Sequence, residues 1–408
     1  MNIIYLGINL IIFILPLYLL RFKIFGIPTT ALEISIYLIF LLWLAKGNYK
    51  KFLRRLIKEN KWLSIGILLL IVGITISTLF SSNIKISAGI WKGWFLDPIL
   101  FFILIISTIK TRTQIKTVLL SYFSSGFLVA FISFFYLAQK KLDPIGRLQA
   151  FYNSPNYLAM YLAPAFIIGF YFLVFKLIKK EQKTNKDFLC LKFFSFFSGN
   201  PAKELKFFIA TGLLFLSVAL FFTQSFGAWV GVLYGIGFGL FVYLLKSKKL
   251  LALSILGFTL IASLILVQLA LIQKYSSLEA RLLIWQKAIE IFKKSPILGI
   301  GPGTFENYFP PYPIWGVPQP HNIFLAFLLQ TGIIGFAGFI LILIWFFKNA
   351  FRKVRKNLLA EISILDLLLI SVMTYILIHG LVDTTYWKND LSIIFWFLIA
   401  LMSVKRKI

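Results

Sequence analysis

The sequence is poor in cysteine, histidine and acidic residues. Its 408 residues include one cysteine, two histidines and 14 aspartates and glutamates, against 42 lysines and arginines. With a single cysteine, Cys190, the chain cannot form an internal disulfide, so its cysteine content does not indicate a redox compartment. The two histidines are His321 and His379, and the formal net charge is +28 at pH 7.

Long polar stretches are also scarce. Hydrophobic residues make up 60% of the chain and the mean hydropathy is +0.89, which excludes an ordinary soluble protein and predicts an integral membrane protein. About twelve apolar runs are long enough to cross a membrane as helices. The first has no basic region before it and no cleavage site after it, so we expect it to be retained. The predicted spans are residues 2–20, 25–45, 62–80, 94–109, 117–138, 157–178, 207–223, 228–245, 250–271, 323–347, 362–382 and 390–403.

Lysine and arginine predict the orientation, because short loops rich in them stay in the cytoplasm. With a cytoplasmic N-terminus, the loops after even-numbered spans hold most of the 42 basic residues, which predicts an even number of spans and two cytoplasmic termini in a cell membrane. The positive charge is then a collar that attracts anionic lipids, and we expect no nucleic acid partner. These loops are residues 46–61, 110–116, 176–206, 246–249 and 348–358, followed by the tail 404–408.

The pattern predicts a single integral membrane domain over residues 1–408, with two substantial outer segments, 139–156 and 272–322. The second, between spans nine and ten, begins SSLEARLLIWQKAIEIFKKSP. Ser276 and Glu279 form a capping-box signature, Lys293 and Lys294 suit a helix end, and Pro296 stops the helix. An amphipathic helix is therefore expected, with an apolar face formed by Leu282, Trp285, Ile289 and Phe292, and with Arg281 and Trp285 on one side.

The rest of this loop, GIGPGTFENYFPPYPIWGVPQPHN at residues 299–322, is rich in glycine and proline. These residues exclude regular structure, and unpaired backbone groups cannot face lipid. We therefore expect the loop to line a water-accessible cavity at the outer interface, with His321 at its rim. GIGPG follows no strand and has no P-loop lysine, so it is no nucleotide-binding motif, and Gly301 and Gly303 more simply permit tight turns.

Three segments together, GRLQAFYNSPNYLA, EARLLIWQKAIEIFKKSPILGIGPGTF and HNIFLAFLLQTGIIGF, resemble the O-antigen ligase and polymerase family of membrane glycosyltransferases. The resemblance covers residues 140–340. It implies an all-α polytopic enzyme of the GT-C type, which moves a glycan from a polyprenyl diphosphate carrier to an acceptor hydroxyl at the outer face of the membrane. The acceptor would be a lipid-linked sugar, a glycan chain or a protein side chain, as in surface polysaccharide synthesis.

The resemblance also implies roles for individual residues and predicts that no cofactor or metal is needed. Arg147 and Arg281 would contact the donor diphosphate, and His321 would assist the acceptor. Guanidinium groups suit a diphosphate leaving group because they offer paired, permanently charged donors, and a neutral imidazole can take the proton of a hydroxyl. Residues with a possible supporting role are Asn156, Trp285, Gly301, Gly303, Asn322, His379 and Asp383.

Several alternatives stay open in the sequence. Asp383 could orient His321 or His379 or bind sugar hydroxyls, and a structural hydrogen bond is equally compatible. Asp97 is similar, and Glu33 lies within a span, where a charge needs a partner or a proton. Many relatives have an arginine where this chain has Phe226, so either that arginine is not essential or a third phosphate contact is missing.

Two other classes of function compete with the glycosyltransferase. About twelve helices with cytoplasmic termini also describe a secondary transporter. The loop between spans two and three lacks the acidic, glycine and arginine motif expected of that architecture, and the longest outer loop lies between spans nine and ten. A non-catalytic envelope scaffold is the third class, and it requires that Arg147, Arg281 and His321 do not converge.

Overall fold

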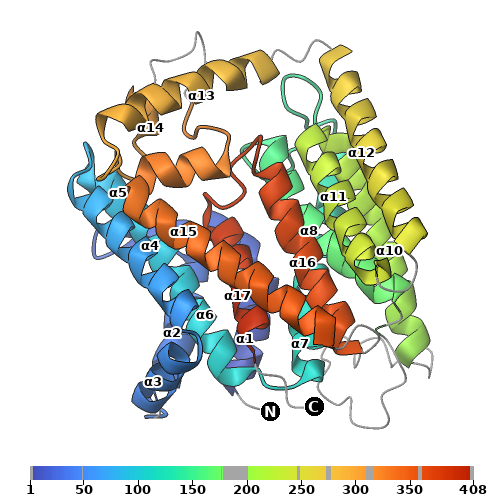
Figure 1. Ribbon diagram of the computed structural model, residues 1–408, viewed down its shortest axis with the longest axis horizontal. Coiled ribbons are helices and arrows are strands. Elements are labelled where there is room, and N and C mark those ends of the chain that lie inside the picture. Colours follow the sequence, from blue (N-terminus) through green and yellow to red (C-terminus); the bar gives the residue numbers. More distant parts are fainter. Residues whose placement is uncertain are drawn as a thin grey trace.

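The computed structural model describes residues 3–47, 49–175, 177, 201–245, 249–272, 277–308, 317–356 and 361–404. Most of these residues are helical, and the long helices run roughly side by side as a bundle (Figure 1). α13 lies across one end of the bundle, and α3 lies at the other (Figure 1). We call these the α13 end and the α3 end. The architecture agrees with the predicted class, a polytopic helical membrane protein.

The elements follow one another along the chain as short and long helices with one pair of strands. The N-terminal elements are α1 (Ile3–Phe13), η1 (Leu15–Leu19), β1 (Arg21–Ile24), β2 (Ile27–Thr30), α2 (Ala31–Leu44), α3 (Tyr49–Glu59) and α4 (Lys61–Leu79). The central elements are α5 (Ile84–Ile90), η2 (Trp91–Leu96), α6 (Asp97–Thr108), α7 (Arg112–Ala138), α8 (Pro155–Val174), α10 (Pro201–Thr223), α11 (Phe226–Leu244) and α12 (Lys249–Ile272). The C-terminal elements are α13 (Ser277–Lys294), α14 (Phe305–Tyr308), α15 (Ile323–Lys356), α16 (Glu361–His379) and α17 (Asn389–Ser403).

The predicted all-α class needs one correction, a small antiparallel hairpin between the first two long helices. β1 pairs with β2 from Arg21 opposite Thr30 to Ile24 opposite Ile27. α2 therefore begins at Ala31 and not at residue 25. Thr30 caps it by accepting a hydrogen bond from the Glu33 N–H, as threonine commonly does at a helix start.

Within the described residues, seven helices are long and apolar enough to cross a membrane, namely α4, the continuous run α5–η2–α6, α7, α8, α10, α11 and α15. Five shorter apolar helices lie at Ile3–Phe13, Ala31–Leu44, Lys249–Ile265, Ile364–His379 and Asn389–Ser403. Together they coincide with the twelve predicted spans in sequence position. The multi-pass character of the chain is thus supported, and the count of twelve crossings stays a prediction.

α17 forms the centre of the bundle. Every residue from Asn389 to Met402 is buried, and the helix packs against α6, α16, α15 and α8. Protein neighbours therefore cover this apolar helix on all sides, as in the core of a large bundle. Because α17 is fixed in this way, the loop that joins α16 to α17 has both its ends anchored in the core.

α15 packs closely along α4 through glycines. A Cβ added to Gly73 of α4 would lie 2.2 Å from the backbone nitrogen of Gly335, and a Cβ on Gly338 would lie 2.4 Å from the nitrogen of Leu70. Small residues at such spacing let two membrane helices approach until their backbones touch. α15 also kinks at Gly332, where φ is 65° and ψ is 179°, so the predicted span 323–347 is two helical pieces that meet at an angle.

Gly332→Ala is expected to destabilise the protein strongly. A Cβ at this position would lie 2.0 Å from the carbonyl oxygen of Ile297, and the positive φ disfavours any L side chain. We expect a loss of about 2 kcal/mol or more, from left-handed strain together with the clash. Thermal unfolding of the purified protein in detergent measures this. Gly257→Ala in α12 is the matched control, because nothing lies within 4 Å of its added Cβ, and an equal loss in both variants contradicts the prediction.

The predicted amphipathic helix is present as α13, but only Trp285 and Phe292 of the predicted apolar face pack against the bundle. Ile284, Ala288 and Ile291 are buried, whereas Leu282 is 55% exposed and Ile289 is 45% exposed. The buried residues pack with Ile300, Phe305, Val317 and Leu329 beneath α13, and Trp285 and Phe292 lie at the edge of this cluster. The spacing of the apolar residues did not identify the packed face, because α13 has apolar residues on two sides.

Other predictions about polar groups have clear outcomes. Glu33 is partnered, as expected, by Lys92 at 2.7 Å and by the hydroxyl of Thr29 at 2.9 Å. Asp97 is buried and accepts a hydrogen bond from the Tyr37 hydroxyl. Cys190, Ser276 with its proposed capping role, and residues 309–316 of the proline-rich loop lie outside the described residues.

Candidate functional site

His321 and Asp383 form a pair at the α13 end of the bundle. The His321 Nδ1 lies 3.1 Å from the Asp383 Oδ1. His321 lies just before α15, and Asp383 lies in the loop between α16 and α17. The carboxyl group is almost wholly buried, with 3% of its side chain exposed, whereas 33% of the imidazole is exposed. One end of the imidazole is therefore held by the protein while the ring stays open to a substrate.

Asp383 is itself fixed by two donors. The Asn156 side-chain amide donates to its Oδ2 at 2.8 Å, and the Thr384 N–H donates to its Oδ1 at 2.8 Å. Burial by itself raises the pKa of this carboxyl. The positive charge of a protonated His321, its hydrogen bond, and the nearby His379 and Arg281 outweigh burial and hold the Asp383 pKa well below its usual range. Asp383 is therefore a carboxylate near neutral pH.

The ionised carboxylate decides which tautomer His321 adopts. A carboxylate oxygen only accepts hydrogen bonds, so the neutral imidazole must carry its proton on Nδ1, and its Nε2 is left with a free lone pair. This assignment follows from the hydrogen-bond network. The arrangement gives His321 a basic nitrogen on the ring atom farther from Asp383.

The backbone around His321 is held in an uncommon conformation. Its φ is 46°, in the left-handed region that few non-glycine residues adopt. The next residue, Asn322, starts α15 by accepting hydrogen bonds from the N–H groups of Phe324 and Leu325, and its amide donates to the Leu381 carbonyl. The Ile323 N–H also donates to the Gly380 carbonyl at 2.7 Å. The start of α15 is thereby fastened to the loop that carries Asp383.

α13 brings Arg281 and Trp285 to the same place. The Arg281 Nε donates to the carbonyl of Val382, next to Asp383, at 2.8 Å. The Trp285 indole N–H points to the His321 carbonyl at 3.4 Å, which is a weak contact. The prediction that these two residues share one face of the helix is confirmed, because both reach toward the histidine and the aspartate.

Arg147 is placed differently from Arg281. Its Nε pairs with the Asp143 carboxylate at 3.1 Å, and its backbone N–H donates to the other oxygen of the same carboxylate. In the described part of the chain, no hydrogen bond or ion pair joins Arg147 to His321, Arg281 or Asp383. The structure thus brings Arg281 and His321 together around Asp383 and leaves Arg147 in a turn of its own.

The other predicted supporting residues lie around the site or under the loop. His379 ends α16, where its Nδ1 lies 2.9 Å from the Tyr375 hydroxyl. The histidine that Asp383 contacts directly is therefore His321. The Gly301 N–H donates to Ser77 and the Gly303 N–H to Gln330. These two glycines have φ values of 89° and 78°, and they hold the loop turn against α4 and α15.

One basic residue at this end has no role in the sequence-based prediction. Lys388 immediately precedes α17, and its ammonium lies 3.5 Å from the centre of the Tyr157 ring. Tyr157 follows Asn156, which binds Asp383. The sequence did contain a hint of this residue. Lys388 ends the segment HGLVDTTYWK, which also holds His379 and Asp383, and it lies at the end of the bundle where few basic residues were expected.

A metal site is a separate question. Within the described residues, no group of three or more His, Cys, Asp or Glu side chains is arranged to hold a metal ion. The expectation that the protein acts without a metal stays a prediction. Phe226, where the resemblance led us to expect an arginine, begins α11 with its ring 5.0 Å from that of Trp229, so this position is part of an aromatic contact.

The fold and the site define a class, a multi-pass helical membrane protein with a carboxylate-oriented histidine and an arginine at one end of its bundle. Residues 211–340 match the family model described as O-Antigen ligase. This match confirms the resemblance found in the sequence and supports a glycosyl-transferring ligase or polymerase. It runs from α10 into α15 and contains Arg281 and His321. No curated protein matches the chain.

The two arginines differ in expected effect. Arg281→Ala is expected to raise the KM for the lipid-linked donor about tenfold or more, since one charged hydrogen bond is worth about 1.5–3 kcal/mol. Arg147→Ala is expected to act through its turn, so Asp143→Ala would match it. Initial rates at varied donor concentration measure both. If Arg147→Ala raises the donor KM while Asp143→Ala leaves it unchanged, Arg147 contacts the donor and the prediction is wrong.

Proposed function

We propose that this protein transfers a glycan from a polyprenyl diphosphate carrier to an acceptor hydroxyl at the extracytoplasmic face of the membrane. The observation that carries the proposal is the half-exposed His321, oriented by a buried carboxylate, with Arg281 bound to the same loop. The matched family supports a glycosyl-transferring ligase or polymerase. The carrier, the acceptor, the membrane face and the roles of individual residues belong to the proposal.

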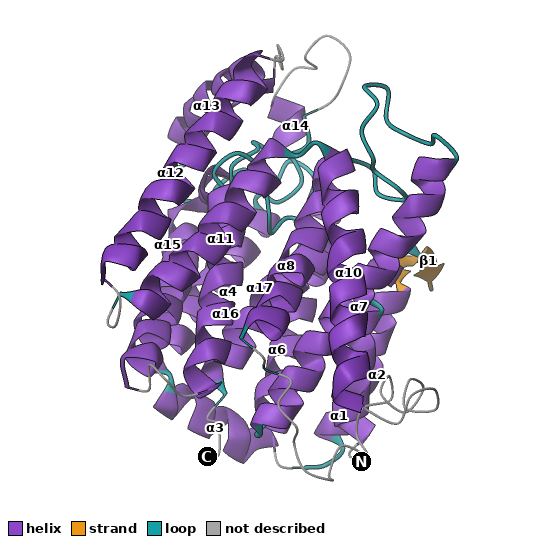
Figure 2. Cartoon of the chain, turned by 90° about the vertical axis from the view of Figure 1, so that its right-hand side faces the viewer, coloured by secondary structure: helices purple, strands orange, loops and turns teal. Residues whose placement is uncertain are grey.

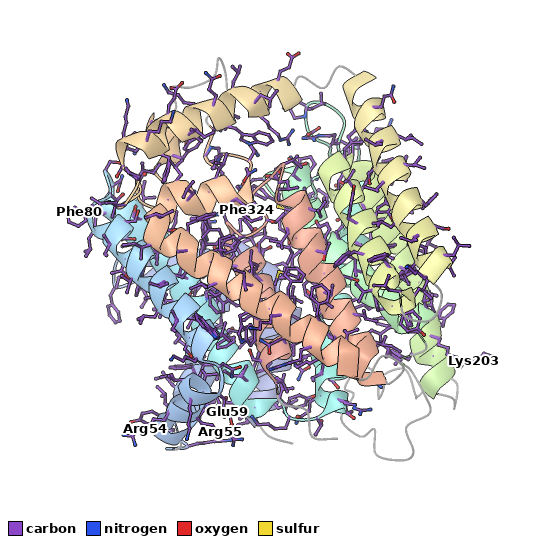
Figure 3. All side chains as sticks on the ribbon, viewed as in Figure 1. Arg54, Arg55, Glu59, Phe80, Lys203 and Phe324 are labelled. Atoms are coloured by element: carbon purple, nitrogen blue, oxygen red, sulfur yellow. The ribbon has the colours of Figure 1, made fainter. Side chains whose placement is uncertain are left out.

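The side of the membrane is argued from charge. Arg54 and Arg55 on α3 and Lys203 on α10 lie at the α3 end, opposite α13 (Figure 3). α3 reads YKKFLRRLIKE, a basic helix at one end of the bundle. Because basic segments stay in the cytoplasm, the α3 end is the cytoplasmic one. The His321–Asp383 pair lies near α13, because Arg281 of α13 donates to the carbonyl of Val382. The α13 end, where loops gather near α14 (Figure 2), then faces outward.

The proposed reaction is a single displacement at the anomeric carbon of the glycan. The His321 Nε2 accepts the proton of the acceptor hydroxyl as its oxygen forms the new bond to that carbon. The bond from the carbon to the diphosphate oxygen breaks, and the polyprenyl diphosphate leaves with the electron pair. Arg281 binds the leaving oxygens, which gain negative charge, and Asp383 stabilises the imidazolium that forms. One displacement inverts the anomeric configuration.

The test is transfer by the purified protein in detergent, with a polyprenyl-diphosphate-linked glycan as donor. We expect product in the presence of a chelator, and none when the donor carries a monophosphate. Product that appears only after a divalent metal is added would show that the metal-free step is wrong. If several diphosphate donors give no product with well-folded protein, the transporter becomes the better hypothesis, and uptake into vesicles is then the measurement to make.

A further inference from the structure

We propose that Lys388 is an anion-binding residue of this site and contacts the diphosphate of the lipid-linked donor. The inference rests on the proposed function, which assigns no role to this residue. Lys388 comes from the loop between α16 and α17, five positions after Asp383. Its backbone is fixed because α17, which follows at once, is buried along its length.

The ammonium of Lys388 is largely enclosed, and among the described residues no carboxylate forms an ion pair with it. Its Nζ lies 3.5 Å from the centre of the Tyr157 ring and 3.4 Å from the Tyr18 hydroxyl. Within the described residues, no carboxylate lies within the 4.0 Å of an ion pair with this nitrogen. An ammonium has three donors. The long hydrogen bond to Tyr18 uses one of them, the Tyr157 ring is a weaker partner for a second, and the third has no partner among these residues. Anionic oxygens are the natural acceptors for a buried cation.

The local balance of charge also favours an anion. Arg21 of β1 and Asp390 of α17 are the charged groups within electrostatic reach of Lys388. Two positive charges and one negative charge give this corner a positive excess. The groups that face the ammonium from the elements packed around it are Tyr18 of η1, Arg21 of β1, Tyr152 in the turn before α8, Tyr157 of α8 and Asp390 of α17.

Lys388 is connected to the histidine pair through α8. The ammonium of Lys388 lies over the ring of Tyr157. The residue before Tyr157 is Asn156, whose side chain donates to Asp383, and Asp383 contacts His321. Tyr157 is within electrostatic reach of both Asp383 and Asp390. Asn156, Tyr157 and Lys388 are all half-buried, so the protein does not close this corner completely. Lys388 and Arg281 both contact groups next to the His321–Asp383 pair, so a donor bound near His321 would have its phosphates close to both cations.

Titration of Lys388 gives the inference a second signature. Burial lowers the pKa of its ammonium to about 8, with Asp390 acting against this change and Arg21 adding to it. A lysine with a lowered pKa is charged below that value and neutral above it. Donor binding that depends on this charge therefore weakens between pH 7 and 9, where a diphosphate is already ionised and an arginine keeps its charge.

The experiment measures binding of unglycosylated polyprenyl diphosphate to the purified protein in detergent. Lys388→Met keeps the apolar stem beside Tyr157 and removes the charge, Lys388→Arg keeps the charge, and Lys287→Ala removes a lysine from the exposed side of α13 as the control. We expect Lys388→Met to raise the Kd about tenfold or more at pH 7, and Lys388→Arg and Lys287→Ala to stay within about threefold of wild type. From pH 7 to 9 the wild type should weaken while Lys388→Arg stays level.

The outcomes separate this inference from the proposed function. An unchanged Kd in Lys388→Met, in protein whose Tm and elution volume match wild type, overturns the inference even if glycan transfer proceeds. Lys388→Arg that behaves like Lys388→Met also overturns it, since charge is then not what matters. If phosphatidylglycerol displaces the diphosphate with equal affinity, Lys388 binds lipid headgroups and not the donor. Lys388-dependent binding without any transfer by wild type supports the anion site and rejects the glycosyltransferase.

Discussion

His321→Ala is expected to lower kcat for glycan transfer by about 10²–10⁴-fold, the usual contribution of a positioned general base. The reason is that an acceptor hydroxyl keeps its proton at neutral pH, and the His321 Nε2 is the basic atom of the site that is both oriented by Asp383 and partly exposed. The binding of donor should change little, because the proposed diphosphate contacts come from other residues. Initial rates and donor Kd, measured side by side, check both parts.

The control for this variant must separate chemistry from folding. The His321 backbone has a left-handed φ of 46°, so alanine at this position could loosen the start of α15. His321→Asn suits this backbone better, because asparagine tolerates left-handed φ, and it has no basic nitrogen. We expect it to be as inactive as His321→Ala, with a Tm close to wild type. Added imidazole should restore part of the rate in His321→Ala. Transfer at the wild-type rate in either variant removes His321 from the mechanism.

Local pattern was sufficient to predict the parts of the site that lie on one helix or at one helix start. Arg281 and Trp285 are four residues apart, and helical geometry places them side by side wherever the helix docks. The position of His321 followed from the glycine and proline residues that precede α15. Both predictions used only residues near one another in the sequence, and for that reason they did not depend on the packing of the bundle.

Contacts between distant segments could not be predicted in the same way. The partner of Asp383 stayed undecided because His379 is four residues away, a spacing that suggests a helical pair. α16 ends at His379, so Asp383 lies in a loop that turns it toward His321. The Asn156 contact joins residues 227 positions apart, and no spacing rule relates them. Lys388 went unassigned for the same reason, since Tyr157 and Tyr18 reach it from two other parts of the chain.

Two features could not be predicted because the sequence pattern fits more than one structure. They are the buried side of α13 and the N-terminal hairpin. Both faces of α13 carry apolar residues, so the face against the bundle is chosen by what lies beneath it, here Ile300, Phe305 and Leu329. Residues 21–30 are too few to register as strands beside two apolar runs. In each case the sequence allowed two structures, and tertiary packing selected one of them.

Asp383→Ala is the second change with a large expected effect, and Asp383→Asn separates its two causes. The Thr384 N–H and His321 both meet Oδ1, so an asparagine should place its carbonyl oxygen there and its amide group at the Oδ2 position. Asn156 can then turn its own oxygen toward that amide. Orientation of His321 survives in this variant, and only the negative charge that stabilises the imidazolium is lost. We expect Asp383→Asn to lower kcat about 10²-fold and Asp383→Ala, which also loses the orientation, to lower it further.

The same carboxylate gives a prediction for stability against pH. The pKa of Asp383 is depressed in the folded protein, so the folded state binds this proton less readily than the unfolded chain, where an aspartate has a pKa of about 3.9. Its contribution to stability is complete above that value and is lost as the pH falls further. Between pH 5 and 2, the Tm of wild type should therefore fall more steeply than that of Asp383→Asn. Parallel Tm curves would show that the pair with His321 does not hold Asp383 ionised. In the activity measurement, an equal kcat for Asp383→Ala and Asp383→Asn would show that only the charge of Asp383 matters and not its orientation of His321.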